Sequence, residues 1–388
     1  MNPSTQPEAS LLHTNSTIHA AVIWADTQRE HAFQTWLHGI ASTHHLSPKT
    51  LRPASADASF RRYFRVDRVR IDSSAASLII MDASPAQENC KPFVDIARLM
   101  AQAGLQVPDI LAWDEAQGFM LLTDLGAKTM MEVINPQLSD ALADPNFDLY
   151  MQAVDTLIDW QLASKPDVLP PYDEALLRRE LALFPDWYLA KHKGITLDKT
   201  QQATLDNALS LIVQRNLAVP NVYVHRDYMP RNLMVMEPKT ADGKRSLGIL
   251  DFQDAVYGPI TYDIASLMSD AFLSWEEPFV LDITIRYWQK AVKVGLLGAN
   301  SPSGWGADFG EFYRAVEWQA LQRHLKILGI FARLTLRDGK PKYLADTPRF
   351  IDYVRKTADR YRELGPFLKL IDQIEGIETA MGYSFGKV

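Results

Sequence analysis

The chain has 388 residues, of which 47% are hydrophobic, and a formal net charge of −7 at pH 7. This length and apolar content are sufficient for two lobes, each with its own core. The negative charge argues against a general nucleic-acid-binding protein, which would carry a basic face, and the single cysteine, Cys90, excludes an internal disulfide and agrees with a reducing compartment.

The first 22 residues are polar, rich in Ser and Thr and without periodicity, which indicates a flexible lead-in. They lack the basic start and the continuous apolar core of a secretion signal. Apolar stretches further along, such as SLIIM and GFMLL, are much shorter than the roughly 20 residues of a transmembrane helix. We therefore expect a cytoplasmic protein with no membrane, nucleic-acid or protein partner.

Residues 23–125 read as a small lobe built on a sheet. A first helix should follow Asp26, a residue type that caps helices, because apolar side chains then recur at helical spacing at Phe33, Trp36, Leu37 and Ile40. The stretch SFRRYFRV alternates in character as strands do, and SLIIMDA, VPDILAWD and GFMLLTDL are further strand candidates. Between them, NCKPFVDIARLMAQAG has the pattern of one helix. We expect an antiparallel sheet in this N-terminal lobe.

Residues 126–388 read as a larger, mainly helical lobe. Long stretches such as FDLYMQAVDTLIDWQLA and EFYRAVEWQALQRHLKILGIFARL carry apolar residues at helical spacing, whereas only NVYVHRD, NLMVME and SLGILDF look like strands. A hinge is expected near Thr123–Gly126. The fold class is therefore α+β, with a sheet-rich N-terminal lobe and a helical C-terminal lobe.

The most informative stretch is VHRDYMPRNLMV, residues 224–235, together with the later GILDFQD. Phosphoryl transfer needs an acceptor hydroxyl held in line and a metal that neutralises charge on the phosphate oxygens. An Asp on a loop, here Asp227, can orient or deprotonate the hydroxyl, and Asn232 and Asp251 offer the oxygen ligands that Mg²⁺ prefers. The alternative is a chance loop with an Asp that caps a strand end. The full order of strand, His-x-Asp-x4-Asn, strand, turn, strand and Asp favours the catalytic interpretation.

These residues resemble the protein-kinase signature, but DFQ stands where a protein kinase has DFG, and no APE follows. With about a hundred mainly helical residues between hinge and motif, the chain resembles the aminoglycoside phosphotransferase-like small-molecule kinases, which include the choline kinases. It is most similar to the bacterial anomeric N-acetylmuramate/N-acetylglucosamine kinases, through DASFRRYFRV, MDASPAQENCKPF, VPDILAWDEAQGFMLLTDLG, VHRDYMPRNLMV, GILDFQDAVYGPITYDIASL and LQRHLKILGIFARL.

The resemblance implies a protein-kinase-like two-lobe fold and ATP with Mg²⁺ as cofactors. It also implies phosphorylation of the anomeric hydroxyl of N-acetylmuramate and N-acetylglucosamine to the sugar 1-phosphate, in peptidoglycan recycling. Residue by residue, Asp227 matches the catalytic aspartate, and Asn232 and Asp251 match the metal ligands. His225 and Asp263 are assigned to structural support of the catalytic loop.

The nucleotide side departs from the usual kinase pattern. No glycine stands where a Gly-rich loop would cover the phosphates, so that small residues such as Ser59 must permit the approach of the backbone, and Met81 stands where a phosphate-pairing lysine is usual. We expect Arg61, Arg62 or Arg65 to replace that lysine, because a guanidinium binds phosphate in a bidentate manner. A solvated sheet edge is the alternative. The resemblance places adenine at the hinge, against Thr123, Asp124 and Leu125.

The acceptor side is less constrained by the sequence. The polar face of this helix is of a kind that is most often solvated, but the resemblance makes Arg323, His324 and Lys326 candidates for binding the sugar. Two other functions stay open. One is a kinase of the same fold that acts on another small alcohol, such as choline or an aminoglycoside. The other is a nucleotide-binding pseudokinase, which the missing lysine would suggest but the intact Asp227, Asn232 and Asp251 argue against.

Overall fold

The computed structural model describes residues 22–55, 61–69, 76–134, 145–236, 247–298 and 304–378. These residues form two compact units. The first comprises the described residues up to Lys91 together with Asp109–Asp124, and the second comprises Pro92–Pro108 and the described residues from Leu125 onward. Residues 1–21 of the expected lead-in, and Ser59, lie outside the described residues.

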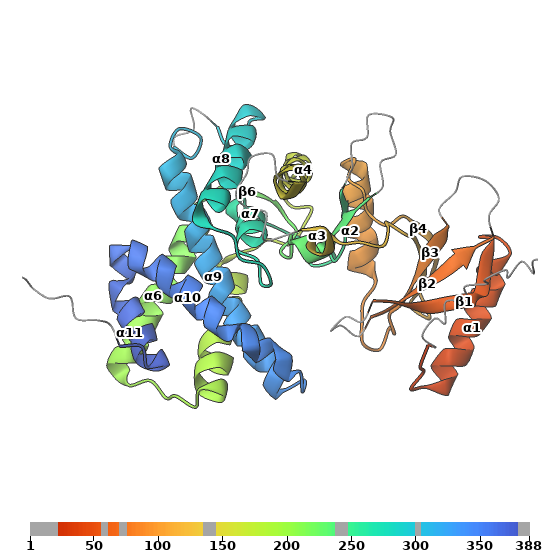
Figure 1. Cartoon of the computed structure of the whole chain (residues 1–388), viewed down its shortest axis with the longest axis horizontal. Helices are drawn as coiled ribbons and strands as arrows, with labels where there is room; N and C mark the ends of the chain where they lie inside the picture. Colours follow the sequence, from red (N-terminus) through yellow and green to blue (C-terminus); the bar gives the residue numbers. More distant parts are fainter. Residues whose placement is uncertain are drawn as a thin grey trace, which may run out of the picture. The chain divides into compact units, whose positions relative to one another are not determined.

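The first unit is a five-stranded antiparallel sheet with one helix on its face. Helix α1 (Thr27–Ala41) begins after Asp26, whose carboxylate accepts hydrogen bonds from the first-turn amides of Gln28 and Arg29. The strand order is β1-β2-β3-β5-β4. The strands are β1 (Leu46–Ser55), β2 (Arg62–Arg68), β3 (Ser77–Asp82), β4 (Ile110–Asp114) and β5 (Phe119–Thr123). Figure 1 shows α1 lying along the sheet.

The two faces of this sheet differ in what they carry. Phe64 of β2 and Ile80 of β3 pack with Phe33 and Leu37 of α1 in the buried core of the unit. Successive side chains of a strand point to opposite faces, and Tyr63 of β2 is paired with Met81 of β3. Met81 and Tyr63 therefore share the face opposite α1. Arg65, two residues after Tyr63 on β2, lies on the same face.

The second unit contains most of the helices. They are α2 (Lys91–Gln102, with its first residue counted in the first unit), α3 (Met130–Val133), α4 (Pro145–Leu162), α5 (Glu174–Leu181), the π-helical η2 (Phe184–His192), α6 (Lys199–Leu217), α7 (Thr261–Met268), α8 (Glu277–Lys293), α9 (Phe309–Leu336), α10 (Thr347–Arg360) and α11 (Gly365–Glu375), with short 3₁₀ turns η3 (Pro230–Asn232), η4 (Pro341–Asp346) and η5 (Arg362–Leu364). Two small antiparallel ribbons pair β6 (Asn221–Val224) with β9 (Val256–Pro259) and β7 (Leu233–Val235) with β8 (Leu247–Ile249). The segments that follow β6, precede β7 and follow β8 carry Asp227, Asn232 and Asp251 of the kinase-like motif.

Helix α9 is the longest helix, with 28 residues, and runs through the second unit (Figure 1). Its polar side is not solvated, because Gln319 and Gln322 are fully buried and Arg323 is 3% exposed. At Gly329 the helix approaches the start of η2 so closely that a Cβ atom would lie 2.3 Å from the carbonyl oxygen of Leu183. Only glycine permits this approach, which fixes α9 against η2 and against α5 just before it.

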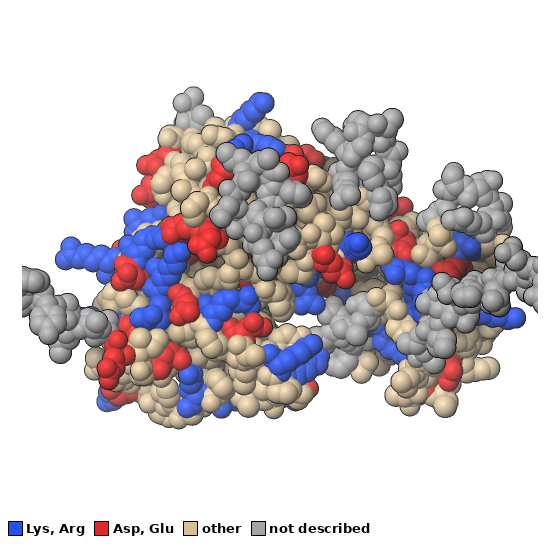
Figure 2. Space-filling view, viewed as in Figure 1, with Lys and Arg blue, Asp and Glu red and all other residues tan. Residues whose placement is uncertain are grey.

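Among the described residues, no helix is both long and apolar enough to cross a membrane. Figure 2 shows acidic and basic side chains interspersed over the face of the helical unit that is in view.

Candidate active site

The predicted catalytic loop, residues 225–232, begins directly after β6 and is held by a carboxylate from α7. Asp263, in the first turn of α7, is completely buried. Its two oxygens accept hydrogen bonds from the backbone amides of His225 and Arg226, at 2.7 and 3.0 Å. Because β9 pairs with β6 and leads directly into α7, the local connection of the chain brings this carboxylate under the loop. The Asp263 interaction stabilises a left-handed backbone at Arg226, whose φ is 77°.

His225 anchors the loop from its other side. Its Nε2 lies 3.0 Å from the carbonyl oxygen of Leu250, which can only accept, so Nε2 carries the proton. Its Nδ1 then accepts from the backbone amide of Asp227 at 3.3 Å. Burial lowers the pKa of His225, although the nearby carboxylates of Asp263 and Asp227 oppose that effect. A neutral imidazole with this tautomer satisfies both contacts and positions the backbone of Asp227.

Asn232 and Asp251 are brought next to each other by backbone contacts. The side-chain amide nitrogen of Asn232 donates to the carbonyl oxygen of Asp227 at 2.8 Å, and this contact leaves the amide oxygen available as a ligand. The Asn232 carbonyl accepts from the amide of Leu250 at 2.9 Å, one residue before Asp251. Asp251 is exposed and has a left-handed backbone with φ 61°. One Asn and one Asp fit a Mg²⁺ ion that takes its other oxygens from phosphate and water, and within the described ranges no three His, Cys, Asp or Glu side chains are grouped to hold a metal alone.

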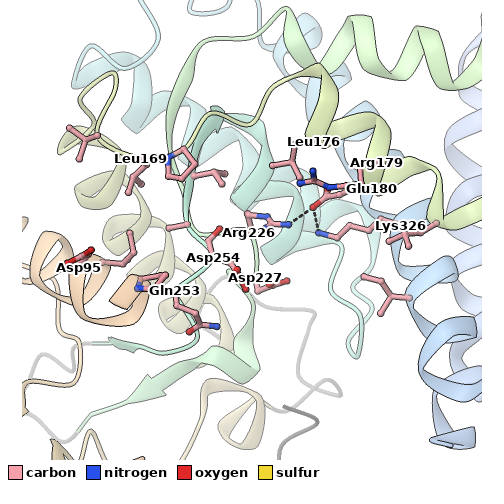
Figure 3. A pocket seen from close by; sticks show the side chains of 18 of the residues that line it. Asp95, Leu169, Leu176, Arg179, Glu180, Arg226, Asp227, Gln253, Asp254 and Lys326 are labelled. Atoms are coloured by element: carbon pink, nitrogen blue, oxygen red, sulfur yellow. Dashed lines mark hydrogen bonds and ion pairs between the residues drawn. The ribbon is translucent and has the colours of Figure 1, made fainter. Parts of the chain in front are cut away.

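A cavity of about 820 Å³ opens beside Asp227 within the second unit. This volume lies in the range of roughly 300–1,000 Å³ that is typical of small-molecule sites. The charged side chains that line it are Asp95, Arg179, Glu180, Arg226, Asp227, Asp254, Lys326 and Arg333. In Figure 3, Asp95 and Asp254 lie on one side of Asp227, and Arg179, Glu180 and Lys326 lie on the other. The cavity is therefore acidic at one end and mainly basic at the other.

Glu180 of α5 organises the basic end of the cavity. It is 5% exposed and accepts from the Tyr172 hydroxyl at 2.7 Å, Lys326 Nζ at 2.9 Å and Gln322 Nε2 at 3.1 Å, and it also forms an ion pair with Arg226. Figure 3 shows the contacts with Arg226 and Lys326 as dashed lines. Burial alone would raise the pKa of Glu180, but Lys326 and Arg226 outweigh burial and lower it to about 2. Glu180 therefore remains a carboxylate at all working pH values.

Glu180 was not among the residues that the sequence singled out. The signal that could have revealed it is its position on α5, where it lies three residues after Leu177 and one before Leu181, which are both buried. An acidic residue on the apolar side of a short amphipathic helix requires partners that offset the cost of its burial. Those partners come from distant parts of the chain, so their identity could not be read from the local sequence.

The three candidates on α9 have different surroundings. Lys326 lines the cavity. Arg323 instead donates from Nη1 to the carbonyl oxygen of Arg226 at 2.7 Å, and its guanidinium lies 4.9 Å from the centre of the Tyr262 ring. Arg323 therefore holds the backbone of the loop and does not line the cavity. His324 faces a separate cavity of about 90 Å³ and stacks on Tyr353 with ring centroids 4.8 Å apart. Burial, with a contribution from Arg323, lowers the pKa of His324 to about 3.

In the first unit, all three candidate arginines have partners of their own. Arg61 pairs with Glu88 at 3.2 Å, and Arg65 pairs with Asp124 through two contacts of 2.6 and 3.1 Å. Arg62 donates to the carbonyl oxygen of Ile23 at 2.7 Å, and its guanidinium lies 4.2 Å from the centre of the Trp24 ring. Within β2, Arg65 lies on the sheet face of Met81 and Arg62 on the other face, whereas Arg61 precedes the strand.

The residues of the predicted hinge are held by hydrogen bonds to neighbouring strands and loops of the first unit. The Thr123 hydroxyl accepts from the amide of Asp109 at 2.8 Å, and the Thr123 amide donates to the carbonyl of the same residue at 3.0 Å. The Asp124 carboxylate, besides its pair with Arg65, accepts from the Ser77 hydroxyl at 2.6 Å. Leu125 packs with Met234 and Met236 in the second unit, and one of the points at which the chain passes between the two units lies between Asp124 and Leu125.

Several known proteins are similar to this chain over most of its length. An N-acetylmuramate/N-acetylglucosamine kinase of Pseudomonas aeruginosa is 48% identical over 333 residues, which cover 86% of this chain and 91% of that protein. A kinase of the same name from Pseudomonas putida is 43% identical over 353 residues, which cover 91% of this chain and 95% of its own. Among solved structures, a choline kinase from Cryptosporidium parvum matches with a TM-score of 0.54 at 12% identity and covers 87% of this chain and 99% of its own.

The structural likeness confirms the protein-kinase-like α+β fold that the sequence indicated, with its small antiparallel sheet and larger helical part. Residues 50–297, more than half of the chain, match the model of the phosphotransferase enzyme family. With the catalytic loop, the paired Asn232 and Asp251, and relatives above 40% identity along most of its length, this chain belongs to the phosphotransferase enzyme family.

Proposed function

We propose that this protein transfers the terminal phosphoryl group of ATP to the anomeric hydroxyl of N-acetylmuramate and N-acetylglucosamine, and so forms the sugar 1-phosphate in peptidoglycan recycling. The observation that carries the proposal is the position of Asp227, on a loop fixed by Asp263 and His225 and at the wall of a cavity of small-molecule size. The relatives that bear the name of such a kinase match this chain along 86% and 91% of its length.

In the proposed reaction, Asp227 accepts a hydrogen bond from the anomeric hydroxyl and takes its proton as the oxygen attacks. A bond forms between that oxygen and the terminal phosphorus, the bond from this phosphorus to the bridging oxygen breaks, and ADP leaves. Asn232 and Asp251 would hold Mg²⁺, which when bound neutralises charge on the phosphate oxygens. The buried contacts of Asp263, His225 and Arg323 to the loop keep the Asp227 carboxylate in place throughout.

For the nucleotide, we propose that the backbone of Thr123–Leu125 holds the base and that Arg65 supplies the cation that Met81 does not. The support for Arg65 is its place on the face of the sheet that carries Met81. Its ion pair with Asp124 would fix the position of the guanidinium. Because a guanidinium has five N–H donors, it can bind Asp124 and a phosphate at the same time. Arg61 stays a second candidate, whereas the stacking of Arg62 on Trp24 makes it a weaker one.

A kinase of the same fold that acts on a cationic acceptor is the second possibility, but the basic end of the cavity disfavours choline or an aminoglycoside. The experiment that separates the possibilities supplies the wild-type protein with Mg²⁺ and ATP and measures ADP formation with N-acetylmuramate, N-acetylglucosamine, choline and an aminoglycoside. Phosphorus and carbon NMR of the product should place phosphate on C1 of the sugar. Turnover of the cations alone would refute the proposal, and ATP binding without turnover of any acceptor would indicate a pseudokinase.

A further inference from the structure

The basic end of the cavity carries more positive charge than its carboxylate can neutralise. Of the four cations that line the cavity, Arg226 and Lys326 are both bound by Glu180. The side chains of Arg179, which is exposed, and Arg333, which is half-buried, have no hydrogen-bond or ion-pair partner among the residues that the structure describes. The Nε atom of Arg333 is buried without a partner in the same part of the chain. A half-buried guanidinium with an unpaired N–H group favours the binding of an anionic ligand.

The charged residues around Arg333 do not neutralise its guanidinium. Burial lowers its pKa and the nearby Arg337 lowers it further, while Asp338 raises it. Asp338 is itself bound to Arg337 through two contacts of 2.6 and 3.0 Å. The fold therefore leaves the charge of Arg333 poorly compensated, although its side chain reaches the wall of a cavity large enough for a substrate.

The chain positions of the two arginines place them beyond Glu180 as seen from Asp227. Arg179 directly precedes Glu180 on α5, and Figure 3 shows it beside Glu180, on the opposite side of the view from Asp95. Arg333 follows Lys326 by seven residues on α9, which corresponds to roughly 10 Å along the helix axis. Long side chains on a helix lean toward its N-terminus, so Arg333 leans back toward Lys326. An anion held here would be part of a molecule whose other end reaches Asp227.

We propose that Arg179 and Arg333 bind the lactyl carboxylate of N-acetylmuramate and thereby determine the preference for this sugar over N-acetylglucosamine. The inference rests on the proposed function. The two sugars differ only by the lactyl ether on O3, which carries a carboxylate that is anionic at neutral pH. With the anomeric hydroxyl at Asp227, that carboxylate points away from the reacting atoms, and the two free guanidinium groups recognise it as charge-assisted hydrogen-bond donors. N-Acetylglucosamine leaves them to water.

The test is the ratio of kcat/KM for N-acetylmuramate to kcat/KM for N-acetylglucosamine. In the double variant Arg179→Met/Arg333→Met this ratio should fall at least about tenfold, because charge-assisted hydrogen bonds are lost for one sugar only. The single variants divide the effect between the two residues, and Arg333→Lys should recover part of it. Matched controls are Arg178→Met, which removes the neighbouring arginine that pairs with Glu174 on α5, and Glu174→Gln, which removes the other partner of that pair. Neither control should change the ratio.

A chemical counterpart removes the charge from the substrate. For the wild-type protein, the analogue of N-acetylmuramate in which the lactyl carboxylate is a carboxamide should lose about the same factor as the double variant, and the double variant should not distinguish acid from amide. If the double variant loses kcat/KM equally for both sugars, so that the ratio does not change, the assignment is overturned. If the wild-type protein phosphorylates neither sugar, the proposed function itself fails, and this result is distinct from either outcome with the variants.

Discussion

The catalytic loop and the polar side of α9 meet at the same cavity but are built in opposite ways. The loop is a contiguous stretch whose functional side chains are fixed mainly by backbone contacts to Asp263, Leu250 and Asn232. The α9 side is an array of side chains tied to a single carboxylate, Glu180, which lies more than a hundred residues away in the chain. A motif held by its own backbone tolerates variation around it, whereas a side-chain array depends on every member. The variants below probe this difference.

The largest effect is expected for Asp227→Asn, which changes the loop side without altering its backbone contacts. Turnover should fall by a factor on the order of 10³, because the proton acceptor for the sugar hydroxyl is lost, while ATP affinity changes little. Steady-state kinetics and calorimetric titration with ATP measure the two quantities. Turnover close to that of the wild type would remove Asp227 from its assigned role.

On the α9 side, Glu180→Gln should destabilise the fold by about 3 kcal/mol, because two buried or half-buried cations lose their counter-ion. The folded-state pKa of Glu180, about 2, lies below the ordinary value of 4.5. Its contribution is therefore complete above pH 4.5 and is lost as the pH falls toward 2. Urea unfolding between pH 7 and pH 3 should show the gap between wild type and variant narrowing with acid. The control, Glu174→Gln, removes an exposed pair and should cost less than about 0.5 kcal/mol.

The loop side should also respond to moderately acidic pH through Asp263. Burial raises the pKa of Asp263 from 3.8 to about 6, although His225 and the amides it binds oppose this. Turnover should decline below about pH 6, because a protonated Asp263 accepts the two loop amides less well. The sign for stability is opposite: a folded-state pKa above the unfolded one means that protonation between pH 6 and 3.8 favours the folded state. Loss of activity with undiminished resistance to urea over this range would support the assignment. Parallel loss of both would contradict it.

The smallest effect is expected in the first unit, where Arg65→Ala should raise the KM for ATP about tenfold through loss of a guanidinium–phosphate contact. Arg62→Ala serves as the comparison, because Arg62 lies on the other face of β2 and stacks on Trp24; its effect should be less than about threefold. Initial rates at saturating sugar separate the two variants. If both variants have the same KM for ATP, Arg65 does not replace the lysine that is absent at Met81.

The different construction of the two sides also explains what could be read from the sequence. The order of strands around Asp227, Asn232 and Asp251 could be recognised because turns and short ribbons are encoded by neighbouring residues. The two-unit α+β fold followed from alternation in β2 and helical spacing in α1 and α9. The polar stripe of α9 looked as if it could be solvated, because nothing near Gln319 or Gln322 shows that Glu180 and the loop lie opposite. Contacts across a hundred residues depend on packing, and local periodicity does not contain them.

The left-handed backbone at Arg226 and Asp251 has a further consequence. A residue with a side chain is strained in this conformation, by about 1 kcal/mol or more, and glycine would relieve the strain. At these two positions, however, glycine would remove the guanidinium that binds Glu180 and the carboxylate suited to the metal. At Asp251, selection for thermal stability alone would therefore favour a replacement that removes a proposed metal ligand, whereas at Arg226 the ion pair with buried Glu180 offsets the strain. Part of the free energy that the fold gains elsewhere is committed to keeping these two side chains where they are.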